Sequence, residues 1–308
     1  MSPVLFWSIA AAAMALPVHA AAPEAQAIVA AASPSASLDE LVEADRAFAK
    51  AGRERPLPDA IGAMLAADAV MPARGDKPFL RSRDEIVAYL AANPAAATAR
   101  ADWYPVRGGI SADGRQGFTA GYIMVTQADG TKQPGKYIAY WARTKSGWRA
   151  LAYKRAPRPE GAVETGFRAI GLPDVAAWRR QDSAGALDRL LAAERAFAAK
   201  AQIVGVGPAF AEYGHADAIN MGASAAYTEG AAAIAAGFDP EPQPGQSIDW
   251  GPEFGLIAPS GDLGVSFGRI HAKQRPPGLA AEAPLPASPF FTIWHRDSPA
   301  SPWRYIAE

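Results

Sequence analysis

The sequence predicts an α+β protein made of two tandem copies of one small domain. The chain has 308 residues, half of them hydrophobic, which is enough for two domains of ordinary size. Residues 38–49 recur at 187–198, with eight of the twelve positions identical. Within each copy, helical patterns precede strand patterns, which favours helices on one face of an antiparallel sheet.

The repeat extends well beyond this first segment. Further matches keep their order and their spacing drifts by only a few residues, which a duplicated domain explains. The matched positions are Asp68 with Asp217, Trp103 with Trp250, Pro105 with Pro252, Gly114 with Gly261, Gly117 with Gly264, Gly121 with Gly268, Trp141 with Trp294, and Trp148 with Trp303.

Three helices are expected at the start of the first copy. Apolar residues at helical spacing over 38–48 predict the first helix, with Ser37 as its N-cap and Asp45 breaking its apolar face. A second helix is expected over 59–67. The third begins at Ser82, where Ser82-x-x-Glu85 forms a capping box.

Strands are expected to follow these helices. Asp113-Gly114 lies between two extended runs and predicts a hairpin turn, and Ser260-Gly261 occupies the matching place in the second copy. Residues 118–126, 137–143 and 148–153 then complete a meander of antiparallel strands.

These patterns set the expected boundaries. The two domains are expected at 37–155 and 187–308, after a flexible Ala/Pro/Ser-rich segment at 21–36 and joined by a linker at 156–186. A proline-rich loop at 275–289 is either a lid or partner contact, or an ordinary surface loop.

The first twenty residues resemble a signal peptide. The apolar run Val4–Leu16 is followed by Val18-His19-Ala20, a pattern that suits signal peptidase. The run is shorter than the roughly 20 apolar residues that span a bilayer. We therefore expect a periplasmic or secreted protein with no membrane contact after signal removal, the alternative being an uncleaved anchor.

Composition excludes several classes of function. A formal net charge of −1 gives no basic excess for binding nucleic acid. The chain has no cysteine, which excludes disulfides and thiolate metal sites. The histidines of the second copy, His215, His271 and His295, show no recognised metal spacing, and no phosphate-binding loop is present, so no metal or cofactor is expected.

The two units resemble the nuclear transport factor 2-like superfamily, and within it the SnoaL-like domains. The resemblance rests on the first helix ending in Arg-Ala-Phe, the Ala-Asp-Ala segment, Ser260-Gly261-Asp262-Leu263-Gly264 and the closing Trp-x-Arg … Trp-Arg pair. It implies two cone-shaped domains, each a curved antiparallel sheet wrapped around about three N-terminal helices with an apolar pocket inside. Members include isomerases, cyclases, dehydratases and non-catalytic modules, so the fold does not choose the chemistry.

An isomerase of this family would carry an acid just after the first short strand. The matching segments, 69–75 and 218–228, contain neither Asp nor Glu, which argues against isomerase-type proton transfer. The preceding acids, Asp68 and Asp217, are expected to hydrogen-bond local backbone amides.

One sheet face differs between the copies. Strand alternation places Tyr122 and Met124 on one face, and the matched positions in the second copy hold Arg269 and His271. If this face lines a pocket, Arg269 holds an anion, with Glu229 or Glu253 as its internal partner, and His271 shuttles a proton. If the face meets solvent, both are ordinary surface residues. The expected ligand-binding residues are Trp103, Tyr122, Tyr140, Tyr227, Trp250, Arg269, His271 and Trp294.

Two classes of function remain open from the sequence. The first is binding of a small, partly apolar and perhaps anionic molecule in a cone pocket, with or without cofactor-free acid/base chemistry in the second copy. The second is a non-catalytic structural or protein-interaction module that uses its sheet faces, including self-association into homo-oligomers.

Overall fold

The computed structural model describes residues 33–73, 77–178, 184–238, 248–275 and 278–308. The predicted signal peptide at 1–20 and residues 21–32 of the segment that follows lie outside the described residues. No helix in the described part of the chain is both long and apolar enough to cross a membrane.

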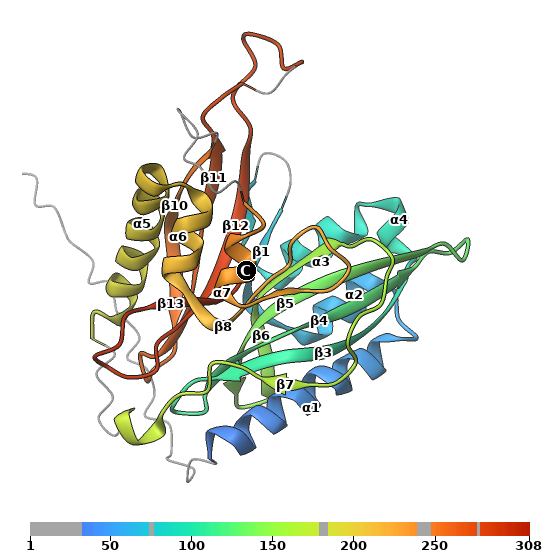
Figure 1. Cartoon of the computed structure of the whole chain (residues 1–308). Helices are drawn as coiled ribbons and strands as arrows, with labels where there is room; N and C mark the ends of the chain where they lie inside the picture. The colour runs from blue at the N-terminus through green and yellow to red at the C-terminus, as the bar shows by residue number, and fades with distance from the viewer. Residues whose placement is uncertain (1–32, 74–76, 179–183, 239–247, 276–277) are drawn as a thin grey trace, which may run out of the picture. The chain divides into compact units, whose positions relative to one another are not determined.

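The first half forms a curved sheet with helices on one face (Figure 1). Its strands run in the spatial order β2-β1-β6-β5-β4-β3, and all neighbours are antiparallel except the parallel pair β1 and β6. The elements are α1 (Pro34–Gly52), α2 (Leu57–Met64), β1 (Leu65–Pro72), β2 (Phe79–Leu80), α3 (Arg83–Ala91), α4 (Pro94–Ala97), β3 (Arg100–Ile110), β4 (Gln116–Thr126), β5 (Lys132–Thr144) and β6 (Gly147–Pro157).

The second half repeats this arrangement. Its strand order is β9-β8-β13-β12-β11-β10, again with one parallel pair, β8 and β13. The elements are α5 (Ala186–Val204), α6 (Val206–Tyr213), β8 (Gly214–Asn220), β9 (Thr228–Glu229), α7 (Ala231–Ala235), β10 (Ile248–Ile257), β11 (Leu263–Ala272), β12 (Ala287–His295) and β13 (Arg304–Ala307). The α+β class and the matching order of elements agree with the sequence prediction.

The predicted local signals hold at the third helix and at both hairpin turns. The Ser82 side chain accepts the Glu85 N–H at 3.2 Å and caps α3. Gly114 and Gly261 have φ values of 66° and 75°, a region that favours glycine and that both hairpin turns require.

Two helix boundaries differ from the prediction. The N-cap of α1 is Ser33, and Ser37 lies buried inside the helix, because Pro34 begins the helix one turn earlier. The second helix ends at Met64 rather than at residue 67, because Leu65 pairs with Ala150 of β6 and starts a strand.

The acids expected to follow the second helix therefore lie in strands. Asp68 is exposed in β1. Asp217 of β8 lies 3.7 Å from the guanidinium of Arg168. The predicted backbone-capping role is wrong for Asp217, because its carboxylate faces this arginine.

The repeated Pro and Gly positions mark one β-bulge in each half. The register of β3 against β4 shifts after Pro105, opposite Gly121, and that of β10 against β11 shifts after Pro252, opposite Gly268. A side chain at either glycine would run into backbone carbonyl oxygen on the facing strand, so each bulge requires a glycine.

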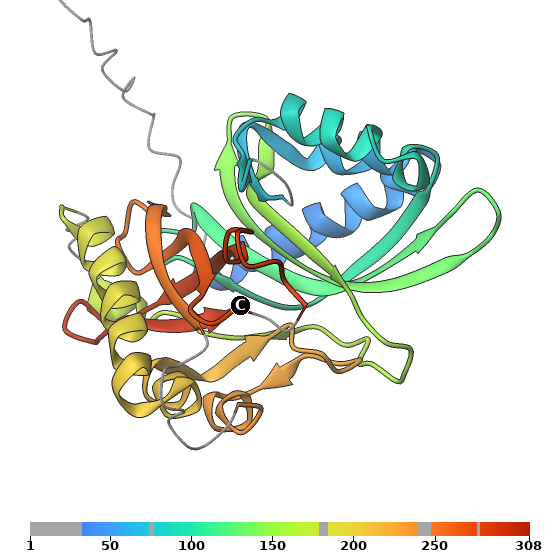
Figure 2. The same cartoon turned by 90° about the horizontal axis from the view of Figure 1, so that it is seen from above.

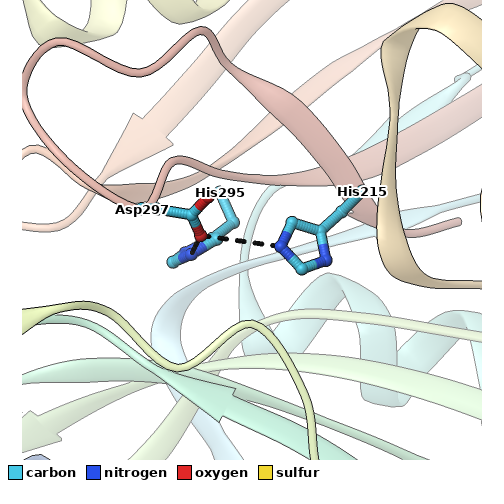
Figure 3. A group of neighbouring side chains, drawn as sticks. All are labelled: His215, His295 and Asp297. Carbon is cyan, nitrogen blue, oxygen red and sulfur yellow. Dashed lines mark hydrogen bonds and ion pairs between the residues drawn. The ribbon is translucent and has the colours of Figure 1, made fainter.

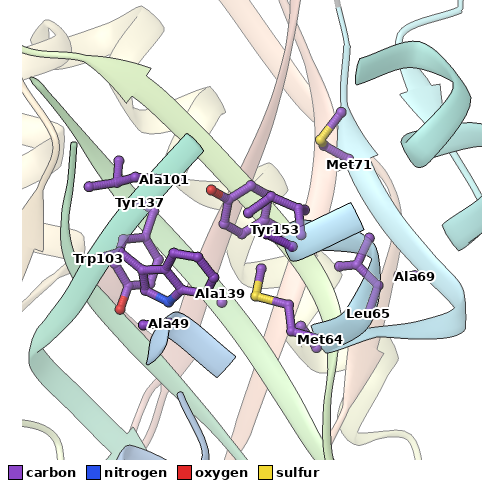
Figure 4. Close-up of a cluster of buried hydrophobic side chains, with 14 of the residues drawn as sticks. Ala49, Met64, Leu65, Ala69, Met71, Ala101, Trp103, Tyr137, Ala139 and Tyr153 are labelled. Atoms are coloured by element: carbon purple, nitrogen blue, oxygen red, sulfur yellow. The ribbon is translucent and has the colours of Figure 1, made fainter. Parts of the chain in front are cut away.

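Three hydrophobic clusters hold the described residues together. One packs the helices of the first half against the concave face of its sheet and includes Trp103 and Tyr137 (Figure 4). Another does the same in the second half around Phe197 and Trp294. The third joins the opposite, outer faces of the two sheets and includes Phe118 and Phe267; we call it the shared cluster. Figure 2 shows the helices of the first half enclosed by their own sheet.

The predicted linker contains ordered structure. Residues Arg168–Ala169 form β7, which pairs with β3 at the edge of the first sheet. Val175–Trp178 form a short 3-10 helix, and the Trp178 indole N–H donates to the Asp297 carbonyl at 2.9 Å. The connection is therefore attached to both halves.

Candidate functional site

A cavity of about 1100 Å³ is bordered by both halves. Most of its wall is apolar. Side chains that line it include Met71, Leu90, Ile123, Phe210, Ile270 and Phe290. A volume of this size holds a drug-sized or lipid-sized molecule.

A lysine and a glutamate lie in the wall of this cavity. Lys154 projects from β6, and its ammonium group donates to the Phe291 carbonyl at 2.9 Å and lies 4.6 Å from the Phe291 ring centroid. Glu308 follows β13, and the Oε2 atom of its side chain is buried without a hydrogen-bond partner among the described residues. Arg155 is a third ionisable residue in this mostly apolar wall.

Burial shifts both groups toward neutrality. It lowers the pKa of Lys154 to about 8, against the attraction of Glu308. Burial likewise raises the pKa of Glu308 to about 7, against the attraction of Lys154. With pKa values near neutrality, each of these groups suits acid/base work near pH 7.

Each half also buries one carboxylate at the matched position of its first helix. Asp45 accepts the Trp103 indole N–H at 2.8 Å and the Tyr137 hydroxyl at 2.7 Å. Glu194 accepts N–H groups from Trp250 and Trp294 at 2.9 and 3.0 Å, and the Ser266 hydroxyl at 2.7 Å. Burial raises the pKa of both acids, and these hydrogen bonds oppose the rise.

Each of these two carboxylates holds the first helix of its half, α1 or α5, against the sheet of that half. Their hydrogen bonds join the helix to strands on the concave face, and both acids are fully buried, with exposures of 0% and 1%. In the sequence, Asp45 stands out only as a break in an apolar helix face. An acid on that face in both copies, facing a repeated tryptophan, was the signal for a buried carboxylate.

His215, His295 and Asp297 form a cluster on the second half (Figure 3). One carboxylate oxygen of Asp297 lies 3.1 Å from His295 Nε2 and 3.5 Å from His215 Nε2. Burial is the main reason that the pKa of His295 falls to about 4, so this ring is neutral at pH 7. This cluster has no signal in the sequence, because the two strands that carry its histidines lie on either side of β13.

The outer nitrogens of the two rings disfavour a metal ion in this cluster. His215 Nδ1 accepts the Asp217 backbone N–H at 3.0 Å, so the neutral ring carries its proton on Nε2. Metal-bound histidines instead donate their second N–H to an acceptor. His295 Nδ1 is buried and has no hydrogen-bond partner among the described residues. The arrangement therefore fits two N–H groups donating to one carboxylate.

The expected pocket position of Arg269 and His271 does not occur. Both continue the outer face of β11, beyond Val265 and Phe267 of the shared cluster, and neither lines the cavity. Arg269 pairs with Glu253, one of the two partners considered for it, and its side chain is 43% exposed. His271 is exposed. Strand alternation correctly placed Arg269 and His271 on one face of β11, but this face points away from the helices.

Of the other expected ligand-binding residues, only Trp250 lines the cavity. Trp103 and Trp294 belong to the closed cores on the concave faces. Tyr122, Tyr140 and Tyr227 are buried in the shared cluster. The second suggested acid, Glu229, pairs with Arg107 and Arg168.

Comparisons with known proteins show likeness at the level of the fold. No family model and no curated protein matches the chain. Solved structures similar to it include an NTF2-like protein with a cystatin-like fold from Novosphingobium aromaticivorans, at 17% identity and a TM-score of 0.32, covering 42% of this chain and 86% of that one.

Two further structures are similar to the same extent. A domain of unknown function with a cystatin-like fold from Nostoc punctiforme is 14% identical, with a TM-score of 0.32. The match covers 38% of this chain and 77% of that one. A structure from Catenulispora acidiphila in complex with S-DNPA is 15% identical, with a TM-score of 0.32. The match covers 40% of this chain and 94% of that one. Each of these three structures matches less than half of this chain.

Proposed function

We propose that this chain binds a small, largely apolar molecule in the cavity bordered by its two halves. The cavity itself supports the proposal, because about 1100 Å³ of mostly apolar wall is large enough to enclose a ligand. Lys154 and Glu308 give this wall a polar end, so the ligand would place a hydrogen-bonding or anionic group beside the Lys154 ammonium.

The alternative function, a module that associates through its sheet faces, is less well supported. The outer faces of the two sheets pack against each other in the shared cluster, which uses them within the chain. Phe118 and Phe267 are both 0% exposed there. This leaves less apolar sheet surface for a partner protein than two separate cones would offer.

The proposal is tested by blocking the cavity without disturbing the core. Ser288 of β12 is exposed and lines the cavity, so Ser288→Trp should obstruct it at little cost in stability. Ala287, the adjacent residue, is exposed and does not line the cavity, so Ala287→Trp is the matched control. Decanol and decanoate are suitable probes, one neutral and one anionic.

We expect both probes to raise the melting temperature of the wild type and of Ala287→Trp, and to have little effect on Ser288→Trp. Stronger binding of decanoate than of decanol, lost in Lys154→Met, would identify Lys154 as the anion partner. Equal responses from Ser288→Trp and Ala287→Trp would show that the probes bind elsewhere and would overturn the proposal.

We also propose that the protein is exported. The apolar run Val4–Leu16 and the small residues around Ala20 support this. N-terminal sequencing of protein recovered from its native host is expected to begin near Ala21. Soluble cytoplasmic protein that retains Met1 would contradict export.

A further inference from the structure

Lys154 differs from the other partly or fully buried lysines of the described chain, Lys136 and Lys200, because it alone of the three lines the cavity. The ammonium group of Lys136 donates to the carbonyls of Met221 and Ala226, which enclose it away from the cavity. Lys154 makes one hydrogen bond within the described chain, to the Phe291 carbonyl, and lines the cavity. An ammonium group has three N–H donors, so its geometry leaves room for a ligand atom.

The residues near Lys154 include an acid, a second basic residue and an aromatic ring. Glu308 lies in the same wall and can take or return a proton, and Arg155, the next residue of β6, also lines the cavity. The face of Phe291 lies beneath the amine. Desolvation in an apolar pocket is one way in which proteins make a lysine amine nucleophilic toward a carbonyl carbon.

We propose that Lys154 forms an imine with an aldehyde or ketone that carries an apolar chain. The inference rests on the proposed ligand binding and names the chemical class of the ligand. The lowered pKa of Lys154, about 8, adds support, because the neutral amine is then more than a hundredfold more populated at pH 7 than in an ordinary lysine with a pKa of about 10.4.

The step balances with the groups in place. The Lys154 ammonium releases a proton, which reaches the Glu308 carboxylate in the same wall through solvent, and the free amine lone pair then attacks the carbonyl carbon. The carbonyl π electrons move to oxygen, which takes a proton from the newly bonded nitrogen, and a neutral carbinolamine forms. Glu308 returns its proton to this hydroxyl, the C–O bond breaks, and water leaves as the nitrogen lone pair forms C=N. The ammonium and the carbonyl compound thus yield a protonated imine and water, with no oxidant or reductant.

The experiment traps this imine in the full chain. Decanal is added near pH 7 with sodium cyanoborohydride, which reduces an imine to a stable secondary amine, and peptide mass spectrometry then locates the decyl adduct. Lys136 is the internal control, since burial also lowers its pKa to about 8, but it does not line the cavity. Exposed lysines such as Lys77 report the background rate.

We expect the Lys154 peptide to be modified on the order of tenfold faster than the Lys136 and Lys77 peptides. Decanol should compete with decanal, and Ser288→Trp should slow labelling of Lys154 alone. Lys154→Arg keeps the positive charge and should form no adduct at this position. If that variant fails to fold, the relative labelling rates of the Lys154, Lys136 and Lys77 peptides in the wild type still test the proposal.

The outcomes separate this inference from the proposed function. If decanol binds the wild type but not Ser288→Trp, and Lys154 is modified no faster than Lys136, then imine formation is wrong and ligand binding stands. If decanol binding is also insensitive to Ser288→Trp, both proposals are wrong.

Discussion

A buried acid on the first helix is the most informative residue in each half. Glu194 supplies the acceptor for three donors on the concave sheet face, and Asp45 does the same for two. Such a carboxylate is stable in the core only because its oxygens are hydrogen-bonded. It also fixes the depth at which the helix sits, since its partners come from separate strands.

Removing one of these acids should be costly. Glu194→Leu is expected to lower the free energy of unfolding by about 2–5 kcal/mol, because the indole N–H groups of Trp250 and Trp294 lose their buried acceptor. Urea unfolding followed by tryptophan fluorescence measures this. Glu194→Gln retains an acceptor oxygen and should cost clearly less; equal losses in the two variants would argue against the hydrogen-bonding account.

Asp262 gives a pH-dependent prediction. Its buried carboxylate accepts the Ala112 backbone N–H at 2.9 Å and the Ser260 hydroxyl, and burial raises its pKa to about 6. Because the folded state then binds the proton more tightly than the unfolded state, Asp262 makes stability fall as pH rises from about 4 to about 6. The full effect is at most about 3 kcal/mol.

Asp262→Asn removes this titration. We expect the stability of the variant relative to the wild type to increase between pH 4 and pH 7, as measured by urea unfolding at both values. His295, with its pKa lowered to about 4, gives the opposite trend, since its contribution is lost as pH falls. Both proteins carry His295, so its effect cancels in the comparison. Parallel pH profiles for the two proteins would contradict the assignment to Asp262.

At the scale of elements, the capping of α3 illustrates a feature that local sequence determines. Ser82→Ala removes the side-chain oxygen that accepts the Glu85 N–H, and the expected loss is about 1 kcal/mol in the free energy of unfolding. Thermal or urea unfolding provides the measurement. Ser82→Asp, which restores an acceptor, should recover most of the loss; a variant with alanine that is as stable as the wild type would show that the cap contributes little.

Features set within a few residues could be predicted from the sequence. The cap at Ser82, the turns at Gly114 and Gly261, and the order of helices and strands follow from local propensity and from the repeat. The end of α2 could not, because the start of β1 at Leu65 depends on pairing with Ala150, which is 85 residues away in the chain.

The candidate site was less accessible to sequence reasoning. Alternation correctly grouped Arg269 with Phe267, but it does not say which face of a sheet meets the helices. Lys154 and Glu308 carry no motif, and the cavity that brings them into one wall is bordered by both halves. A single lysine in a strand becomes a candidate site residue only when the tertiary structure buries it, and the local sequence pattern does not encode that burial.

At the scale of the whole described chain, the two halves depend on each other. Residues 32–308 form one compact unit, and the shared cluster buries apolar side chains from both sheets. Polar contacts cross the same boundary: Arg107 pairs with Glu229, and the Lys154 ammonium donates to the Phe291 carbonyl. Separating the halves would expose the cluster and leave these charges without their partners.

We therefore expect the two halves to unfold together. Hydrogen exchange followed by mass spectrometry, at increasing urea concentration, can report β4 and β11 separately; both strands contribute to the shared cluster through Phe118 and Phe267. Their amides should lose protection at the same urea concentration, because neither sheet face is stable in water without the other. Glu229→Ala, which removes the acid shared by Arg107 and Arg168 and leaves Arg107 with Glu164 at 3.5 Å, should shift both strands to lower urea in parallel. Loss of protection in β11 while β4 remains protected would instead show that each half folds independently, as two unconnected copies of one domain would.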